Sequence, residues 1–464
     1  MRFRRWMIAL ALAVGLGLAL ALAGSAPSTP EAAQPADPVS DGPPAPEAPS
    51  GPLDPDVDEA LDDLLAAFLA GGFDQQTLDA VAASGDARTA WFLADLLRFA
   101  APGGDGDALT AAFEALTGAE VAAPGRSSWG AVTDLLIGWD LPAWPGYREL
   151  KAALFLQVEP GWAPFFADPD ADIDWRLVSW GGVPIDDRPE GAAEGCPRGC
   201  IPALDDPALI PASEGDWYPD DRIVFGVVVA DEAVAFPKHQ MEIHEMVNIT
   251  IGGRRLGIPY CTLCGSAQAY FTESAPGQFD PPVLRTSGLL IRSNKMMYDL
   301  RTQSVLDTFT GRAVSGPLLD AGVTLEQTTV VTSTWGAWKQ DHPETRIVAS
   351  DGGIGRVYPL DPLQGRDDDG PIFPIGPVDP RLPVQEPVVG VIAPDGTPIA
   401  LPVALAQAEL RAGRAVAVGD VEAHADGDGL RVTARGSQLP AHQAFWFAWS
   451  QFHPDTAVWT PLSE

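Results

Sequence analysis

Positive charge is scarce in this chain of 464 residues. Its 29 lysines and arginines stand against 63 aspartates and glutamates, which gives a formal net charge of -34. Lysine occurs at only four positions, Lys151, Lys238, Lys295 and Lys339. A surface of this sign repels phosphate backbones, so we expect no nucleic-acid partner.

The sequence also lacks the common signatures of hydrolases and nucleotide-dependent enzymes. It contains no glycine-rich loop that would cradle phosphates and no Ser/His/Asp nucleophile signature. The segment His244-Glu-Met-Val-Asn248 lacks the second histidine of a zinc-protease motif. The sequence therefore assigns no enzymatic reaction, and the few soft or titratable side chains that remain are the candidates for chemistry.

Long apolar runs are missing except at the N-terminus. Arginines near the start precede an unbroken apolar run from Met7 to Ala23, and small residues follow it. We interpret residues 1–26 as a secretory signal peptide. An uncleaved anchor is the alternative, because the run is at the short edge of the roughly 20 residues that span a bilayer. The mature protein is thus expected outside the cytoplasm (secreted, periplasmic or on the cell surface), with membrane contact only through an uncleaved N-terminal segment.

A polar linker and a helical region follow the signal. Residues 27–52 are mainly Pro, Ala, Ser, Asp and Glu, the composition of a disordered linker. From residue 53 apolar residues recur at helical spacing between glycine-containing breaks. The phrase Gly85–Arg98 resembles one helix of a HEAT-type repeat, and both a helical bundle and a short solenoid fit it. Residues 138–175, with tryptophans among prolines, predict an irregular packed connector.

β-Branched residues dominate from about residue 200. The segments 222–230 and 233–237 predict a β-hairpin, and more short apolar segments with Gly and Asn turns follow. Residues 386–402 repeat the order strand, turn, strand, proline. The pattern Trp-x-x-Trp followed by His-Pro-acid-Thr occurs in both 335–345 and 446–456. This recurrence predicts an internal repeat.

The overall prediction is an α+β protein. Its helical region and Trp-rich connector cover residues 53–199, and a mainly antiparallel β-rich domain covers residues 200–464. The domain is expected to consist of two related halves, at about 215–350 and 380–464. Residues 351–380, rich in Asp, Gly and Pro, are expected to form the linker between them or a loop over a site.

Several landmarks follow one another in a specific order within the β-rich part. They are Cys200–Asp205, Ile223–Val227, His244–Asn248, Tyr260–Ala267, Ser287–Leu290, Asn294–Asp299, Thr302, Gly316–Leu318, Trp335, Trp338 and His342–Thr345. Together they resemble a bacterial and archaeal family, domain of unknown function 3179, over residues 200–464. The resemblance implies that the chain shares the fold of this family, for which no activity is established. The chain departs from the family pattern at Phe236, where a tyrosine commonly precedes the proline.

Cys261-x-x-Cys264 is the strongest chemical feature of the chain, and the small residues that follow it would let another group come close. Three interpretations remain open. The two thiols could form a structural disulfide, bind a soft metal as thiolates, or cycle between dithiol and disulfide. Cys196 and Cys200 are the remaining cysteines. They could pair with each other or with the first two, or complete a four-thiolate zinc site, and an oxidising compartment favours disulfides.

A metal centre could recruit further ligands from the same part of the chain. His244 precedes the cysteines on an expected short helix, and an imidazole with two thiolates is a ligand set for copper or zinc. Met297 could add a thioether ligand, and Asp299, outside the ligand set, could orient the His244 ring. The alternative assigns Met297 to the core, His244 to a half-buried hydrogen bond and Asp299 to a surface turn.

Two functions are compatible with these observations. In the first, Cys261 and Cys264, with His244, form a metal-binding or thiol-redox site in an exported protein. In the second, the chain is a non-catalytic binding module whose cysteines are structural disulfides and whose Trp-rich surfaces bind a protein or glycan.

Overall fold

A computed structural model of the protein describes residues 43–72, 75–100, 103–121, 127–193, 195–366 and 370–461. The predicted signal peptide and most of the predicted linker lie outside these residues. Across the described ranges, no helix is both long and apolar enough to cross a membrane. The linker residues from 43 onward are extended and lie on the helical region, where Trp139 Nε1 donates to the Pro43 carbonyl at 2.7 Å.

Helices make up the first part of the chain, as predicted. They are α1 (Pro55–Leu69), α2 (Gln75–Ala83), α3 (Ala90–Phe99), α4 (Gly104–Thr117), α5 (Ser128–Trp139), α6 (Tyr147–Val158) and α7 (Ala163–Ala167). Helix α3 is apolar on nearly all sides and is packed against α4, α5 and α6. The HEAT-type assignment stays a prediction.

The expectation of an irregular connector over 138–175 is wrong for its middle, where α6 forms. Pro145 precedes this helix and Pro160 follows it. Proline is disruptive inside a helix but not outside its ends, so both prolines bound α6 without breaking it.

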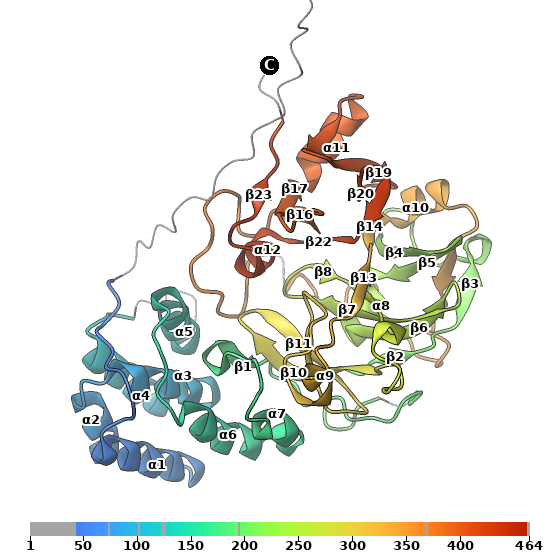
Figure 1. The fold of residues 1–464 in the computed structure, drawn as a ribbon. Helices are drawn as coiled ribbons and strands as arrows, with labels where there is room; N and C mark the ends of the chain where they lie inside the picture. Colours follow the sequence, from blue (N-terminus) through green and yellow to red (C-terminus); the bar gives the residue numbers. More distant parts are fainter. Residues whose placement is uncertain are drawn as a thin grey trace, which may run out of the picture.

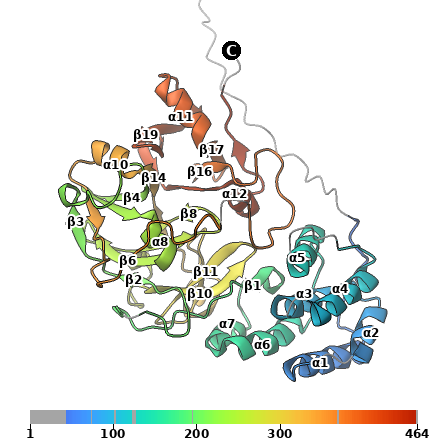
Figure 2. The same cartoon turned by 180° about the vertical axis from the view of Figure 1, so that it is seen from behind.

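Five small sheets make up the β-rich part and pack in a propeller-like arrangement beside the helices (Figures 1 and 2). The first sheet contains β1 (Val178–Trp180), β10 (Leu284–Ile291), β11 (Asn294–Asp299) and β12 (Val305–Asp307). The second contains β13 (Glu326–Thr328), β9 (Ala269–Phe271), β7 (Arg254–Cys261), β6 (Met246–Ile251) and β2 (Leu204–Asp205), with β8 (Ser266–Ala267) paired to β7. The third contains β14 (Val331–Thr334), β4 (Ile223–Val229), β5 (Glu232–Pro237), β15 (Arg346–Val348) and β3 (Leu209–Pro211).

Two further sheets lie in the C-terminal part. The fourth contains β22 (Ala441–Phe445), β16 (Pro387–Ile392), β17 (Pro398–Pro402) and β23 (Ala457–Val458). The fifth contains β18 (Val416–Val418), β19 (Val421–Asp426), β20 (Gly429–Ala434) and β21 (Ser437–Leu439). Short helices connect the strands: α8 (Lys238–His244), α9 (Gly316–Asp320), α10 (Trp335–Asp341), α11 (Val403–Arg411) and α12 (Trp446–Phe452). The α+β class is therefore as predicted.

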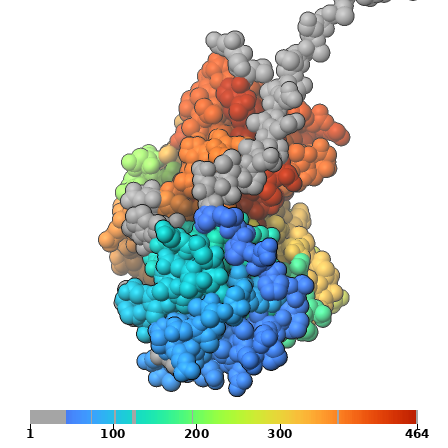
Figure 3. Space-filling model, turned by 90° about the vertical axis from the view of Figure 1, so that its left-hand side faces the viewer, coloured from blue at the N-terminus to red at the C-terminus, as the bar shows by residue number. Residues whose placement is uncertain are grey.

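The helical region and the first sheet share one hydrophobic core. Strand β1 directly follows the helices and pairs antiparallel with β10. Trp162 Nε1 donates to the Ser287 carbonyl at 2.7 Å, and the rings of Phe165 and Tyr298 lie 5.4 Å apart. In the space-filling view of Figure 3 the helical residues lie directly against the rest of the chain. The two regions are thus joined by packing as well as by the chain.

Four strands of the third sheet have the same order and the same internal contacts as the four strands of the fourth, and the third sheet adds β3 next to β15. In each, an antiparallel hairpin (β4–β5 or β16–β17) is flanked by one antiparallel and one parallel strand. A Cβ at Gly226 would lie 2.4 Å from the Trp338 ring, and a Cβ at Gly390 would lie 2.1 Å from the Trp449 ring. Each indole therefore lies directly on the backbone of a glycine in the neighbouring strand.

The hydrogen bonds of the two indoles match as well. Trp338 Nε1 donates to Thr345 Oγ1 at 2.9 Å, and Trp449 Nε1 donates to Thr456 Oγ1 at 2.9 Å. All four tryptophans of the recurring pattern are buried. The recurring Trp-x-x-Trp motif is thus a packing device that fixes a short helix on a sheet.

The glycine–indole contacts generate a stability prediction. Gly226→Ala and Gly390→Ala should each lower the free energy of unfolding by about 1–3 kcal/mol, because the added methyl group must displace a buried indole. Chemical denaturation of each variant measures the change. Gly277→Ala is the matched control, since no heavy atom lies within 4 Å of its Cβ position. Equal losses in all three variants would contradict this interpretation of the contacts.

Candidate functional site

Cys261 and Cys264 lie at the end of the β7–β8 hairpin. Cys261 ends β7 and pairs with Ser266 of β8, and Cys264 lies in the turn between them. Gly265 follows with a φ of 58°. A Cβ at this glycine would lie 2.9 Å from the Phe445 ring, and Phe445 N donates to the Cys264 carbonyl at 2.8 Å. The close approach that the small residues allow is therefore that of strand β22, packed over the cysteine turn.

Both thiols are free, buried and in contact with each other. The two Sγ atoms lie 3.0 Å apart, and both side chains are at most 1% exposed. Cys264 Sγ also lies 3.4 Å from the Ser293 carbonyl and 3.5 Å from Asn294 Oδ1, both of which can accept its proton. Cys264 is therefore placed as a protonated thiol that can donate a hydrogen bond.

A buried lysine and a buried glutamate lie beside the thiols. Lys295 on β11 is 2% exposed, and its Nζ donates to the backbone carbonyls of Glu245 and Tyr260, the latter at 3.3 Å. Nζ also lies 3.5 Å from Glu245 Oε2, and Thr262 Oγ1 donates to Glu245 Oε1 at 3.1 Å. An ammonium this deeply buried needs such partners, because an unpaired charge in the interior is very costly.

The pKa values of the two thiols are shifted in opposite directions. Burial and the charge of Glu245 raise the pKa of Cys261. The hydrogen bond with Cys264, helped by the smaller effects of the Lys295 backbone N–H and charge, outweighs them, and the pKa falls below its usual value. For Cys264 burial and the adjacent Cys261 both raise the pKa, well above its usual value. Burial also lowers the pKa of Lys295 and raises that of Glu245. Cys261 is the thiol that ionises first.

A cavity of about 250 Å³ opens onto Cys261. Its polar lining includes Glu242, Glu245, Thr262, Thr286, Lys295 and Arg366, and its apolar lining includes Val183, Ile201, Leu263, Leu289, Leu290, Leu363, Ile372 and Phe373. Cys264 is not among the residues that line it. Four of the lining residues belong to the segment 351–380, which connects the two predicted halves and forms part of the cavity wall.

His244 lies away from the thiols, contrary to its predicted place beside them. Its Nδ1 hydrogen-bonds the Pro202 carbonyl at 2.6 Å, and its Nε2 hydrogen-bonds the Tyr358 hydroxyl at 2.7 Å. Helix α8 ends at His244, and Glu245 adopts a left-handed backbone with a φ of 49°. The chain therefore turns between the two residues, so that Glu245 faces the cysteines and His244 does not. Burial lowers the pKa of His244 to about 4, so its ring is neutral at pH 7.

The predicted metal ligands are not brought together. Among the described residues no group of three or more His, Cys, Asp or Glu side chains is arranged to hold a metal ion. Met297 packs in a hydrophobic cluster with residues such as Leu284 and Leu306. Asp299 accepts from the backbone N–H groups of Val283 and Thr302 at 2.8 and 2.9 Å, so it stabilises the turn after β11 and does not orient His244.

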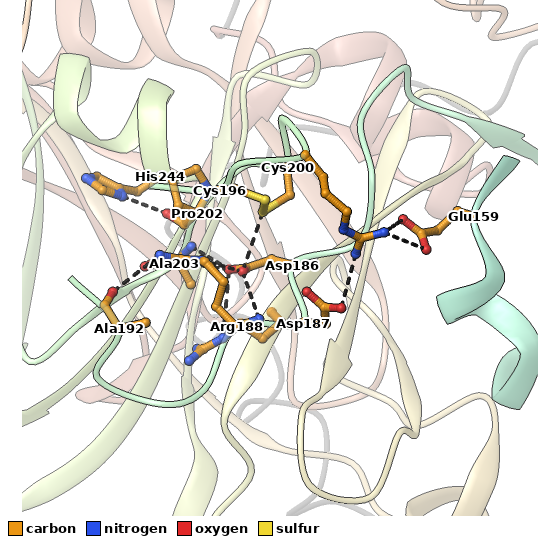
Figure 4. Close-up of a disulfide and its surroundings, with 12 residues drawn as sticks. Glu159, Asp186, Asp187, Arg188, Ala192, Cys196, Cys200, Pro202, Ala203 and His244 are labelled. Carbon is orange, nitrogen blue, oxygen red and sulfur yellow. Dashed lines mark hydrogen bonds and ion pairs between the residues drawn. A yellow bond between two sulfur atoms is a disulfide. The ribbon is translucent and has the colours of Figure 1, made fainter. Parts of the chain in front are cut away.

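The other cysteine pair is a disulfide. Cys196 and Cys200 are bonded to each other, which is the local pairing among the predicted alternatives and excludes them from a four-thiolate zinc site (Figure 4). Arg198, inside the ring that this bond closes, pairs with Glu159 at 2.9 Å and with Asp187 at 3.1 Å. The disulfide thus fixes a loop that binds the helical region.

Sequence reasoning missed Lys295 and Glu245. A signal for the lysine was present: it is one of four in the chain and stands in the apolar strand Asn294–Asp299. A lysine in a strand buried on both faces needs a partner, and this alone marks it for attention. Glu245 carried no comparable signal, because its orientation depends on where α8 ends.

The charge of Lys295 generates a prediction for Cys261. Lys295→Met removes a cation and leaves Glu245 unpaired, and both changes raise the pKa of Cys261. Alkylation of Cys261 by iodoacetamide at pH 7 should slow about tenfold for each unit of the rise, because the thiolate is the reactive form. The pH profile, followed by peptide mapping, should shift to higher pH. Lys339→Met is the control, since Lys339 lies on α10 and pairs with Asp220. The same profile for both variants would contradict a role for Lys295.

Comparison with known proteins gives one match. The model of the family described as "Protein of unknown function (DUF3179)" matches residues 198–425. This range contains the cysteine hairpin, Lys295 and Glu245, and it ends before β20. No curated protein and no solved structure matches the chain significantly. The resemblance that the landmarks predicted is therefore confirmed over residues 198–425, which match the DUF3179 family, while the predicted extension to residue 464 lies beyond the match.

Proposed function

We propose that this is an exported thiol–disulfide exchange protein whose working pair is Cys261 and Cys264. One observation carries the proposal: of two unbonded, touching thiols, Cys261 lines a cavity and Cys264 does not, and the hydrogen bond between them lowers the pKa of Cys261 and raises that of Cys264. Exchange needs this asymmetry, with one accessible thiolate to attack and one shielded thiol to resolve.

The exchange has two balanced steps. Cys261 thiolate attacks one sulfur of a substrate disulfide, so that a Cys261–substrate bond forms and the other substrate sulfur leaves as a thiolate, which takes up the proton of Cys264. Cys264 then attacks Cys261 Sγ, the protein disulfide forms, and the second substrate thiolate leaves and is protonated by water. Two electrons pass from the protein to the substrate, and the reverse sequence oxidises a substrate dithiol.

The neighbouring residues have distinct parts in this scheme. Lys295 stabilises the Cys261 thiolate by its charge, and Glu245 keeps the lysine in place. Cys264, whose pKa is raised, keeps its proton until resolution and donates it in a hydrogen bond to the Cys261 thiolate. The redox state of the compartment decides whether the pair reduces or oxidises its substrate. Export, which the apolar run Met7–Ala23 supports, would place the pair where disulfides are common.

The internal repeat supports a function for the two cysteines other than stabilising the fold. We propose that 215–350 and 380–464 are related halves, on the basis of the matched strand order and glycine–indole contacts of the third and fourth sheets. In the second half the strand β20 leads into β21 through Arg435 and Gly436, and the sequence has no cysteine there. A hairpin of this kind therefore forms without the two thiols.

The alternative, a non-catalytic binding module, has weaker support. Its predicted Trp-rich binding surface cannot include Trp335, Trp338, Trp446 or Trp449, which are at most 1% exposed. Its predicted structural disulfide applies to Cys196 and Cys200 only.

Single-cysteine variants test the proposal. Cys264→Ser removes the resolving thiol, so treatment of the reduced protein with hydroxyethyl disulfide should trap a stoichiometric mixed disulfide at Cys261. Cys261→Ser should form at least about tenfold less adduct, because the remaining thiol does not line the cavity and has a raised pKa. Intact-mass and peptide mapping measure both. Equal adduct formation by the two variants, or none by either, would contradict the proposal.

A further inference from the structure

The wall of the cysteine cavity includes a segment that the helical region holds in place. Ile372 and Phe373 line the cavity, and they belong to residues 370–377, which we call the closing segment. This segment lies in the connection between β15 and β16, far along the chain from the helices it touches. Its position therefore depends on contacts with the rest of the fold.

Helix α5 binds the backbone of the closing segment. Asp134 Oδ1 accepts hydrogen bonds from the N–H groups of Ile375 and Gly376, both at 2.8 Å. Gly376 has a φ of 72°, and a Cβ there would lie 2.4 Å from Ile137 on the same helix. The carboxylate and the close approach together fix the backbone at this point.

An aromatic cluster around Arg98 of α3 binds the wall residue itself. The guanidinium lies 4.6 Å from the ring centroid of Trp129, 5.1 Å from that of Trp180 and 5.8 Å from that of Phe373. Arg98 Nε donates to the Trp180 carbonyl at 2.9 Å, and Trp129 meets Phe373 edge to face at 5.9 Å. Phe373 is therefore held by residues of the helical region and the short strand that follows it.

The closing segment also forms part of the apolar surroundings of the cysteines. Ile375 belongs to the same hydrophobic cluster as Cys261 and Cys264, and Gln451 Nε2 on α12 donates to its carbonyl. The closing segment thus contacts the helical region through Asp134 and α12 through Gln451, and it shares an apolar cluster with the two cysteines. A change in its position changes the wall of the cavity.

We propose that the helical region, through Asp134 and the Arg98 cluster, sets the size of what reaches Cys261, and that the substrates are low-molecular-weight thiols and disulfides. The chemistry of this substrate class rests on the proposed function. The cavity of about 250 Å³ has the volume of only about eight water molecules, at roughly 30 Å³ each. It takes a small organic disulfide with apolar arms against Ile201, Leu289 and Phe373, and it does not take a folded protein surface.

Alkylation by reagents of different size tests the wall without any redox step. The rates for iodoacetamide and for a maleimide on a large polyethylene glycol are measured at Cys261 by peptide mapping. In Asp134→Ala and Phe373→Ala the ratio of the rate with the large maleimide to the rate with iodoacetamide should rise about tenfold. The loss of hydrogen bonds or of wall atoms makes open conformations of the cavity more populated. Asp62→Ala, an exposed change on α1, should leave the ratio unchanged.

Circular dichroism establishes that the variants keep the fold. Phe373→Ala enlarges the cavity and leaves the hydrogen bonds of Asp134 to the closing segment in place. Ratios equal to that of the wild type in both folded variants would overturn the role of the closing segment. Exchange provides the second test: the wild type should react with hydroxyethyl disulfide at least about tenfold faster than with the disulfides of insulin. Equal rates would overturn the size limit alone, whereas no reaction with hydroxyethyl disulfide would contradict the proposed function alone.

Discussion

The buried ammonium of Lys295 is the constraint on which the thiol site depends. A charge with 2% exposure must recover in the interior the hydrogen bonds it loses from water. It does so from Glu245 at the end of α8, from Tyr260 on β7 and from Thr286 on β10. These partners belong to both the first and the second sheet, so solvating one lysine ties two sheets together. The same charge also helps to lower the pKa of Cys261. The packing of the two sheets and the ionisation of the thiol therefore depend on the same residue.

Much of the framework could be predicted from local patterns, and the site only in part. Helical spacing from residue 53 onward predicted the region in which α1 and α3 form, and the segments 222–230 and 233–237 predicted the β4–β5 hairpin. The Cys-x-x-Cys motif located the thiols because its reactivity is visible in the residue types. The sequence did not predict that Glu245, and not His244, lies beside the cysteines. The directions of these two side chains depend on the backbone conformation with which the chain leaves α8. Lys295 was missed because its partners are 35 and 50 residues away along the chain.

The helical region and the family-matched residues 198–425 together form the surroundings of the thiol site. The family match begins at residue 198, yet Glu159 binds Arg198 inside the disulfide ring, and Asp134 and Arg98 hold the segment that walls the cavity. The C-terminal sheets contribute Phe445, which lies over Gly265, and Gln451, which binds the closing segment from its other side. The thiols come from one hairpin, but the size and surroundings of their cavity come from three parts of the chain.

A redox titration of the wild-type protein tests the central claim most directly. The protein is equilibrated in thiol–disulfide buffers of graded potential, and each cysteine is then identified as free or bonded by alkylation and peptide mapping. The account predicts that Cys261 and Cys264 pass together between dithiol and disulfide in one reversible two-electron transition, while Cys196 and Cys200 stay bonded throughout. A Cys261–Cys264 pair that keeps one state at every potential at which the protein stays folded would contradict it.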